Sequence, residues 1–317
     1  MRVLMTVGLL FFVALLGLSG CATINAEKNA PAIGSFVDVE GERLHVLEKG
    51  REHKGKAPSI ILIHGASINL RDMDLALGEE LSGRYHVMMV DRPGRGYSTR
   101  PDDGHRLETQ AALIRDASQQ LGVENPVVVG QSFGGAVSLA YALQYQEEMA
   151  GLVVLAGVSH EWPGGVAWYN NASSMPVVGF FLRRLVIPVY GQFIGRGSVE
   201  SSFEPDPAPE NYYERVGLAL LFRPKDFKSN AADIANLKKE IVAQQDQYAQ
   251  LRLPVAILTG ADDKTVSPEI HSETLARQIE GATLQVLPDT GHALHHAETR
   301  TVIEAIDAVV ARAGAAL

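Results

Sequence analysis

The sequence predicts an α/β fold built on a mostly parallel central sheet with helices on both faces. Short runs rich in Val, Ile and Leu alternate with amphipathic stretches of about 10 to 15 residues, which is the order of βαβ units. Several of these runs are apolar at every position, as expected of strands that are covered on both faces. The alternation breaks once, between Gly157 and Pro254, and we expect this interval to be an inserted unit because connections in α/β units are normally short.

The composition is that of a globular protein without a nucleic-acid partner. The chain has 317 residues, of which 46% are apolar and 21% charged, enough to bury a substantial core. The formal net charge is -9 and the sequence pI is near 5.6. We therefore expect no binding to nucleic acid and no electrostatic docking on anionic lipid.

The first twenty residues have the pattern of an export signal. Arg2 precedes an uncharged apolar run from Val3 to Leu18, which at 16 residues is shorter than the roughly 20 needed to span a bilayer. We therefore expect residues 1–20 to be a signal peptide, with an uncleaved anchor or an ordinary secretory signal as the alternatives. Leu18-Ser19-Gly20-Cys21 is similar to the lipobox of bacterial lipoproteins. This resemblance implies that Cys21, the only cysteine, is lipidated, becomes the mature N-terminus and holds the protein at a membrane.

Residues 21–35 are small and polar without periodicity, so we expect them to form a flexible tether. Because Ala22 rather than an aspartate follows Cys21, the resemblance to proteobacterial lipoproteins implies the outer membrane, facing the periplasm. The folded part is expected to comprise an α/β core of residues 36–157 and 255–317 and an inserted helical cap of residues 158–254.

Each element of the core follows from a local pattern. Gly41-Glu42 separate two runs of alternating character, which predicts a hairpin of residues 36–40 and 43–48. Further strands are expected where β-branched and other apolar residues run together, at residues 60–63, 87–90, 126–129, 152–155, 255–258 and 283–287. Helices are expected where apolar residues recur at helical spacing, at residues 72–81, 109–121, 135–143, 268–279 and 295–311.

The stretch Gly130-Gln131-Ser132-Phe133-Gly134 predicts a nucleophile. It lies between a predicted strand and a predicted helix, where a sharp turn would place Ser132 at the apex. A Cβ atom at Gly130 or Gly134 would crowd the neighbouring backbone of such a turn. The same five-residue pattern also occurs in ordinary glycine-rich loops, so the strand before it and the helix after it carry the prediction.

A serine hydroxyl needs a base, and the base needs a carboxylate that orients it. Two loops that follow later strands supply the candidates: residues 259–268 contain Asp262 and Asp263, and residues 288–293 contain His292. The carboxyl ends of parallel strands meet at one edge of a sheet, so these side chains are expected near Ser132.

Five motifs in order resemble the α/β-hydrolase superfamily over nearly all of the mature length: H-G-A-S at 64–67, D-R-P-G-R-G-Y-S at 91–98, G-Q-S-F-G-G at 130–135, G-A-D-D-K-T-V-S-P at 260–268 and G-H at 291–292. The resemblance implies a triad of Ser132, His292 and Asp263, with Asp262 as the rival acid. It also implies an oxyanion hole made by the backbone N–H groups of Ala66 and Phe133, with Ser67 as the alternative to Ala66. His64 is expected to be structural, and His295 and His296 to be surface or packing residues.

The sharp turn with Ser132 at its apex is called the nucleophile elbow. A serine at this position makes acyl transfer the expected reaction, because similar hydrolases of carbon-halogen bonds and epoxides carry aspartate there and dienelactone hydrolases carry cysteine. We expect a carboxylesterase or lipase-like enzyme that forms an acyl-enzyme from a small, largely apolar acyl substrate. The alternatives are carbon-carbon bond hydrolysis, perhydrolysis or thioester cleavage on the same triad, and a non-catalytic binding lipoprotein of the envelope. We expect no cofactor and no metal, since the histidines and acidic residues show no H-E-x-x-H or similar spacing.

The apolar segment from Met175 to Ile194, interrupted by Arg183-Arg184, has two interpretations. Its side chains could line an acyl pocket, with the arginines pairing with a substrate carboxylate. Alternatively, they pack the cap onto the core while the arginines face water, which is the interpretation we favour.

Overall fold

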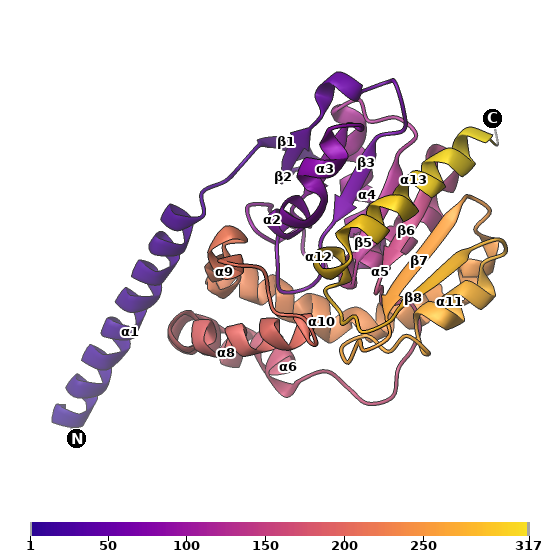
Figure 1. Ribbon diagram of the computed structural model, residues 1–317. Coiled ribbons are helices and arrows are strands. Elements are labelled where there is room, and N and C mark those ends of the chain that lie inside the picture. Colours follow the sequence, from indigo (N-terminus) through magenta and orange to yellow (C-terminus); the bar gives the residue numbers. More distant parts are fainter. Residues whose placement is uncertain (1, 316–317) are drawn as a thin grey trace.

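The computed structural model describes residues 2–315 and confirms the predicted α/β fold (Figure 1). Over these residues the chain forms an eight-stranded sheet in the order β1-β2-β4-β3-β5-β6-β7-β8. β1 pairs with β2, and β2 with β4, in antiparallel register, while every pair from β4 to β8 is parallel. The strands are β1 (Ser35–Val39), β2 (Glu42–Lys49), β3 (Ile60–Ile63), β4 (Val87–Val90), β5 (Val127–Gln131), β6 (Gly151–Leu155), β7 (Val255–Gly260) and β8 (Thr283–Leu287).

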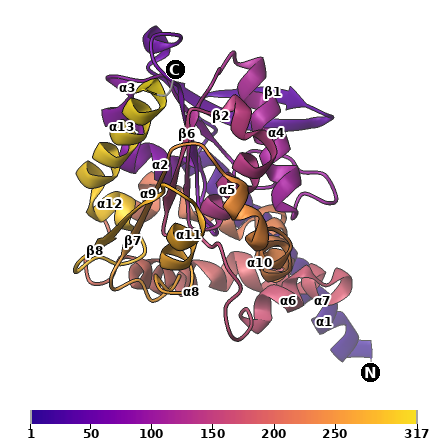
Figure 2. The ribbon, with the colours of Figure 1, turned by 90° about the vertical axis from the view of Figure 1, so that its right-hand side faces the viewer.

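Helices cover both faces of this sheet (Figures 1 and 2). The core helices are α2 (Leu70–Met73), α3 (Glu79–Ser82), α4 (Leu107–Gln120), α5 (Phe133–Tyr145), α11 (Ser272–Gln278), α12 (Leu294–Ala297) and α13 (Thr299–Ala315). A π-helical turn, Asp74–Gly78, joins α2 to α3, so the helix predicted at residues 72–81 is one helical segment with a wider turn in its middle. The helix predicted at residues 295–311 is instead divided into α12 and α13, because Glu298 leaves the helical conformation at φ -121°, ψ 40°.

The central strands are buried on both faces, as their continuous apolar sequences predict. In β3 the side chains of Ile61 and Ile63 join the core under α4 and α5, while Ile60 and Leu62 join the core under α3 and α13. The period of two along the strand therefore divides one apolar run between two cores. This double coverage holds the sheet as a rigid base for the loops at its carboxyl edge.

The segment between β6 and β7, which we call the helical insertion, lies across the carboxyl edge of the sheet (Figure 1). It contains α6 (Trp168–Ser174), α7 (Pro176–Phe181), a π-helical turn (Leu182–Val186), α8 (Ile187–Phe203), α9 (Tyr212–Arg215), a 3-10 helix (Leu218–Phe222), α10 (Pro224–Gln244) and a further 3-10 helix (Gln245–Gln250). Its own small core is built around Phe203, Tyr212, Phe222 and Phe227 and includes Ile68 and Ala293 from two core loops. The insertion is thus packed onto the same edge where the predicted site loops emerge.

At the N-terminal end, α1 (Arg2–Asn29) is a single helix that leaves the body of the protein beside the insertion (Figure 1). It contains Cys21, which is exposed, and residues 21–29 of the segment expected to be a flexible tether are helical in it. Ala26 and Ala30 are buried against Leu220, and Glu27 pairs with Arg223 at 2.9 Å, so these residues are docked on the insertion. Among the described residues, no helix is both long enough and apolar enough to cross a membrane.

Candidate active site

Ser132 occupies a strained turn between β5 and α5, as the glycine pattern predicts. Its backbone has φ 56° and ψ -117°, a region that a residue with a Cβ atom rarely adopts, and its N–H donates to Leu155 O at 2.9 Å. A Cβ atom at Gly130 would collide with Gly134 O, and one at Gly134 would collide with Ile63 O. Both positions therefore require glycine because the backbone approaches closely there, and the turn places Ser132 at the N-terminal end of α5.

The structure brings Asp263, and not Asp262, to His292. Asp263 Oδ2 lies 2.7 Å from His292 Nδ1, while its Oδ1 accepts from the N–H groups of Thr265 and Val266 at 2.8 and 2.9 Å. Asp263 is buried and Asp262 is exposed. Because an ionised carboxylate only accepts hydrogen bonds, the proton of a neutral His292 ring lies on Nδ1 and leaves Nε2 as the acceptor.

His292 Nε2 faces Gln131, the residue before the predicted nucleophile. Gln131 Nε2 lies 3.3 Å from His292 Nε2 and 3.4 Å from His292 O. Within residues 2–315, Ser132 Oγ makes no hydrogen bond to His292, so the two residues lie at the same carboxyl edge of the sheet without a direct hydrogen bond between them. Catalytic hydrogen bonds in ligand-free sites are often open and close when substrate binds.

Two backbone donors beside Ser132 have no acceptor. Among the described residues, the N–H groups of Ala66 and Phe133 donate to no protein atom, whereas Ser67 N donates to Asn230 Oδ1 at 2.8 Å. Unpaired buried donors are rare in folded proteins, and they are the feature that an oxyanion hole requires. The geometry therefore favours Ala66 over Ser67 as the second donor.

A cavity of about 370 Å³ opens between the turn at Ser132, the loop that follows Asp263 and the helical insertion. This volume lies near the lower end of the range for small-molecule sites. The walls are largely apolar and are formed by Ala66, Ser132, Phe133, Val158, Trp162, Pro163, Val166, Ile234, Leu237, Lys264, Thr265, Val266, Ser267, Ile270 and His271. The predicted nucleophile and the two residues that carry the free donors thus line one cavity.

A buried ion pair fixes the insertion over this cavity. Arg92 donates to Asp233 Oδ2 of α10 at 3.0 Å and to Gln110 Oε1 at 2.8 Å, and its guanidinium lies 4.2 Å from the ring centroid of Phe133. Arg100 reaches the other oxygen of Asp233 at 3.0 Å. Burial lowers the pKa of Arg92 to about 10, so its guanidinium remains charged at neutral pH. The D-R-P-G-R-G motif is therefore an anchor for α10 as well as a loop at a strand end.

His64 is a structural histidine, as expected. Its ring is buried, Nδ1 lies 2.8 Å from Gly65 O, and Nε2 accepts from Arg92 N at 3.0 Å. Both ring nitrogens are thus engaged by backbone, with the proton on Nδ1. Burial, reinforced by the charge of Arg92, lowers the pKa of His64 to about 3, which keeps the ring neutral.

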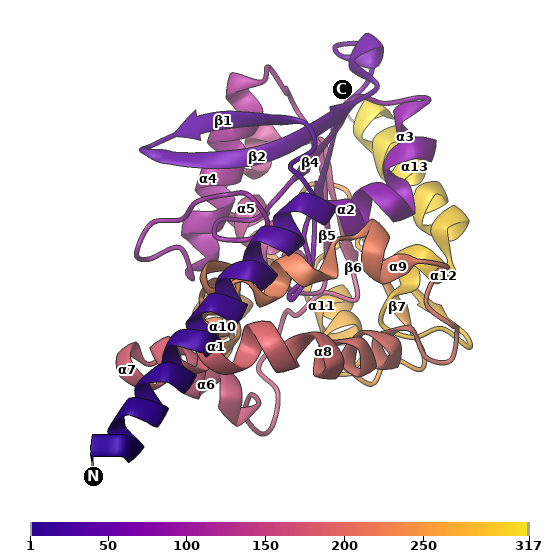
Figure 3. The ribbon, with the colours of Figure 1, turned by 90° about the vertical axis from the view of Figure 1, so that its left-hand side faces the viewer.

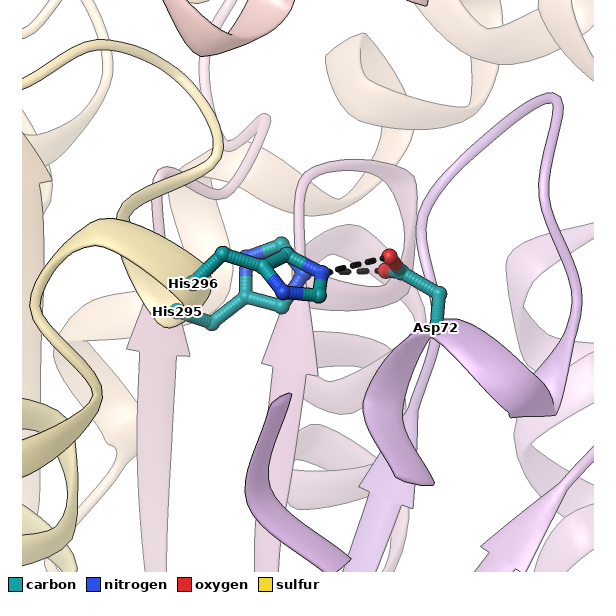
Figure 4. Close-up of side chains that lie close together, drawn as sticks. All are labelled: Asp72, His295 and His296. Carbon is teal, nitrogen blue, oxygen red and sulfur yellow. Dashed lines mark hydrogen bonds and ion pairs between the residues drawn. The ribbon is translucent and has the colours of Figure 1, made fainter. Parts of the chain in front are cut away.

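His295 and His296 are not simple packing residues, because both point at the carboxylate of Asp72 (Figure 4). His295 Nε2 lies 2.9 Å from Asp72 Oδ2, His296 Nε2 lies 2.8 Å from Oδ1, and Tyr212 donates its hydroxyl to Oδ1 at 2.6 Å. Burial raises the pKa of Asp72, but the two histidines outweigh it and hold that pKa well below its ordinary value. This Asp72 cluster joins α2, α12 and the insertion.

The ligand atoms of Asp72, His295 and His296 lie within 4.8 Å of one another, so the set could in principle hold a metal ion. A histidine that binds a metal normally donates its other ring N–H to a second group. His295 Nδ1 is buried and has no hydrogen-bond partner among the described residues. The donor set therefore fits hydrogen bonds to the Asp72 carboxylate better than it fits a metal.

Comparison with known proteins identifies the family that this geometry indicates. Residues 58–299 match the model of the alpha/beta hydrolase fold family, and the chain belongs to that family. A 2-hydroxymuconate semialdehyde hydrolase of Pseudomonas putida is 27% identical over 297 residues, which cover 87% of this chain and 94% of that protein. Haloalkane dehalogenase 2 of Mycobacterium bovis is 25% identical over 282 residues, which cover 83% of this chain and 89% of that protein.

Among solved structures, a thermophilic esterase of Thermogutta terrifontis has the same fold. It superposes with a TM-score of 0.69 at 24% sequence identity, covering 88% of this chain and 99% of that one. The relatives named here are thus hydrolases of several bond types, and the family alone does not choose among them.

Proposed function

We propose that the protein is a serine hydrolase that cleaves esters of small, largely apolar acyl groups. The observation that carries this proposal is the convergence of Ser132 and the two unpaired N–H donors, Ala66 and Phe133, on one apolar cavity. The pair formed by His292 and Asp263 at 2.7 Å follows β7 and β8 at the same carboxyl edge of the sheet and supplies the base.

In the proposed reaction, Ser132 Oγ attacks the ester carbonyl while His292 Nε2 takes the hydroxyl proton. The N–H groups of Ala66 and Phe133 then stabilise the oxyanion, at about 3 kcal/mol for each donor. Asp263 holds the imidazolium through Nδ1. His292 returns the proton to the leaving alcohol, and a water molecule activated by the same nitrogen releases the acid from Ser132.

The identity of the residue at position 132 distinguishes the proposed reaction from that of the dehalogenase relative. Displacement of a halide requires a carboxylate nucleophile in similar hydrolases, and Ser132 stands at the elbow of this chain. A neutral hydroxyl activated by a base suits an acyl centre, where an oxyanion forms and can be held by the free N–H donors.

The test is covalent labelling of Ser132 with a fluorophosphonate, followed by turnover of p-nitrophenyl esters of increasing acyl length. We expect labelling that Ser132→Ala abolishes and that Ser201→Ala, a change at an exposed serine of α8, leaves intact. A cavity of about 370 Å³ favours short and medium acyl chains over long ones. Folded protein that takes up no probe would instead support a binding role without catalysis.

Carbon-carbon bond hydrolysis is the second candidate; the relative that favours it is the 2-hydroxymuconate semialdehyde hydrolase of Pseudomonas putida, whose match covers most of both chains. A direct comparison of 2-hydroxymuconate semialdehyde with p-nitrophenyl butyrate separates the two. Labelling of Ser132 together with turnover of the semialdehyde alone would move the assignment to this second reaction.

We further infer that Cys21 is lipidated and holds the protein at the periplasmic face of the outer membrane. The lipobox resemblance supports this, and the thiol is exposed on α1. Cys21→Ser should move the protein from the membrane fraction to the soluble fraction, and a [³H]palmitate label should disappear with it. Retention of both the label and the membrane association in this variant would rule out Cys21 as the anchor.

A further inference from the structure

A group of large apolar side chains on the insertion is exposed. None of them is among the residues that line the cavity, and each is at least 41% exposed, so this part of the insertion is less covered than a packed segment from Met175 to Ile194 would be. Trp168 is 74% exposed, Val177 69% and Tyr190 60%. We call this group the apolar face; it comprises Trp168, Tyr169, Met175, Val177, Val178, Phe180, Phe181, Val186 and Tyr190. Monomeric proteins seldom expose so many large apolar side chains within one short segment, and such groups mark interaction surfaces.

The charge around the apolar face is unlike that of the rest of the chain. Between Glu161 and Glu200 the sequence has three arginines and no acidic residue, although the whole chain has a net charge of -9. Arg183 is buried and donates to Ser173 O, and Arg196 pairs with Glu214. Arg184 is exposed, and its guanidinium lies 4.9 Å from the ring centroid of Phe180. The segment that carries the apolar face thus contains no acidic residue, and Arg184 gives it an exposed cation.

The neighbouring helix, α1, carries the proposed lipid anchor. α1 packs against the π-helical turn Leu182–Val186 and against α8, which carry Val186 and Tyr190 of the apolar face. Cys21, the proposed lipidation site, is exposed on this helix. Figures 2 and 3 show α1 at the end of the molecule where α6 and α7 lie. The proposed lipid anchor and the apolar face therefore lie at the same end of the molecule.

We propose that the apolar face docks on a lipid bilayer, with its aromatic and aliphatic side chains inserted at the interface and Arg184 facing anionic headgroups. Tryptophan and tyrosine rings favour this interface because one end is apolar and the other forms hydrogen bonds. The docking rests on apolar burial with a single favourable cation, so it needs no polybasic tract and is compatible with an acidic protein. Val166 lines the active-site cavity two residues before Trp168, so the docked surface adjoins the cavity along the chain.

The test measures the polarity around a tryptophan of the apolar face itself, so that membrane attachment through α1 alone is not mistaken for docking of this face. The chain has two tryptophans, and Trp162→Phe leaves Trp168 as the only one. On addition of vesicles of phosphatidylcholine and phosphatidylglycerol, we expect Trp168 emission to move to shorter wavelength and to be quenched by lipids brominated on their acyl chains. Val177→Asp should weaken vesicle partition by about tenfold or more and remove the shift.

The matched control is Val286→Asp, which places the same charge on an exposed valine of β8. This variant should keep both the shift and the quenching. Protein that sediments with vesicles while Trp168 emission stays unchanged would overturn the proposal, because α1 would then anchor a molecule whose apolar face points away. A shift that appears without vesicles and grows with protein concentration would equally overturn it, in favour of contact between two copies of the chain.

Discussion

Gln131 Nε2 lies 3.3 Å from His292 Nε2, so the side chain before the nucleophile faces the ring nitrogen that the proposed reaction needs as a base. An amide N–H that donates to this nitrogen competes with the hydroxyl of Ser132 for the same lone pair. The separation is longer than the usual N–H···N or N–H···O distance, so the contact is weak and costs little to break.

Replacing Gln131 by methionine should therefore free the base. The change removes the donor and keeps most of the side-chain volume, so the fold should persist. At about 1 kcal/mol for a neutral hydrogen bond, the rate of fluorophosphonate labelling of Ser132 should rise by up to about fivefold. A fall of tenfold or more would instead mean that the amide orients the His292 ring, which it also contacts through His292 O.

The two neighbouring aspartates should differ sharply in their effect on activity. Asp263→Asn keeps the oxygen that accepts from Thr265 and Val266 but favours the wrong tautomer of His292, so kcat should fall by about 10³- to 10⁴-fold with little loss of stability. Asp262→Asn alters an exposed side chain and should stay within about twofold of wild type. Steady-state kinetics on p-nitrophenyl butyrate, with thermal melts of both variants, decides the assignment. Comparable losses in the two variants would contradict it.

The features predicted correctly are those that local sequence determines. Ile60–Ile63 reads as a doubly covered strand because each residue is apolar, and the structure buries alternate residues in two different cores. Gly130 and Gly134 predict the elbow because their neighbours leave no room for a Cβ atom. In both cases the sequence signal lies within a few residues of the feature.

The features that the sequence could not predict depend on distant partners. Asp72 meets Tyr212 across 140 residues and His296 across 224, and Arg92 meets Asp233 across 141. Neither spacing nor periodicity reports such contacts, since they exist only once the insertion is docked. The apolar composition of a segment likewise does not determine whether it is buried. The segment containing Val177 has a sequence that suggests a covered surface, but Val177 is exposed.

Acid should destabilise the protein through its buried neutral histidines. Burial lowers the pKa of His64 to about 3 and, with His160 nearby, that of His271 to about 4. Both folded values lie below the unfolded value of 6.5, so the unfolded chain binds more protons between these limits and stability is lost as the pH falls below about 6.5. The depressed pKa of Asp72 acts in the same direction at lower pH, because its contribution is present above the unfolded value near 4 and is lost below it.

At pH 5, each of these two histidines should reduce the free energy of unfolding by about 2 kcal/mol relative to pH 7.5. Urea unfolding followed by circular dichroism at the two pH values measures the sum. His271→Gln, which removes one of the titrating rings, should lessen the dependence of that free energy on pH. Equal unfolding midpoints at pH 7.5 and pH 5 would contradict the expectation.

The Asp72 cluster should contribute to stability through the hydroxyl of Tyr212. Tyr212→Phe removes one of three hydrogen bonds to a buried carboxylate and leaves the ring packed against Phe203, so the free energy of unfolding should fall by about 1.5–3 kcal/mol. Tyr213→Phe is the matched control, because its hydroxyl bonds Glu200 at the surface and should contribute within about 0.5 kcal/mol. Urea unfolding of the two variants measures the difference. Because the same carboxylate holds His295, three residues after His292, the Tyr212→Phe variant should also label Ser132 more slowly, whereas a loss of stability with unchanged labelling would confine the cluster to a structural role.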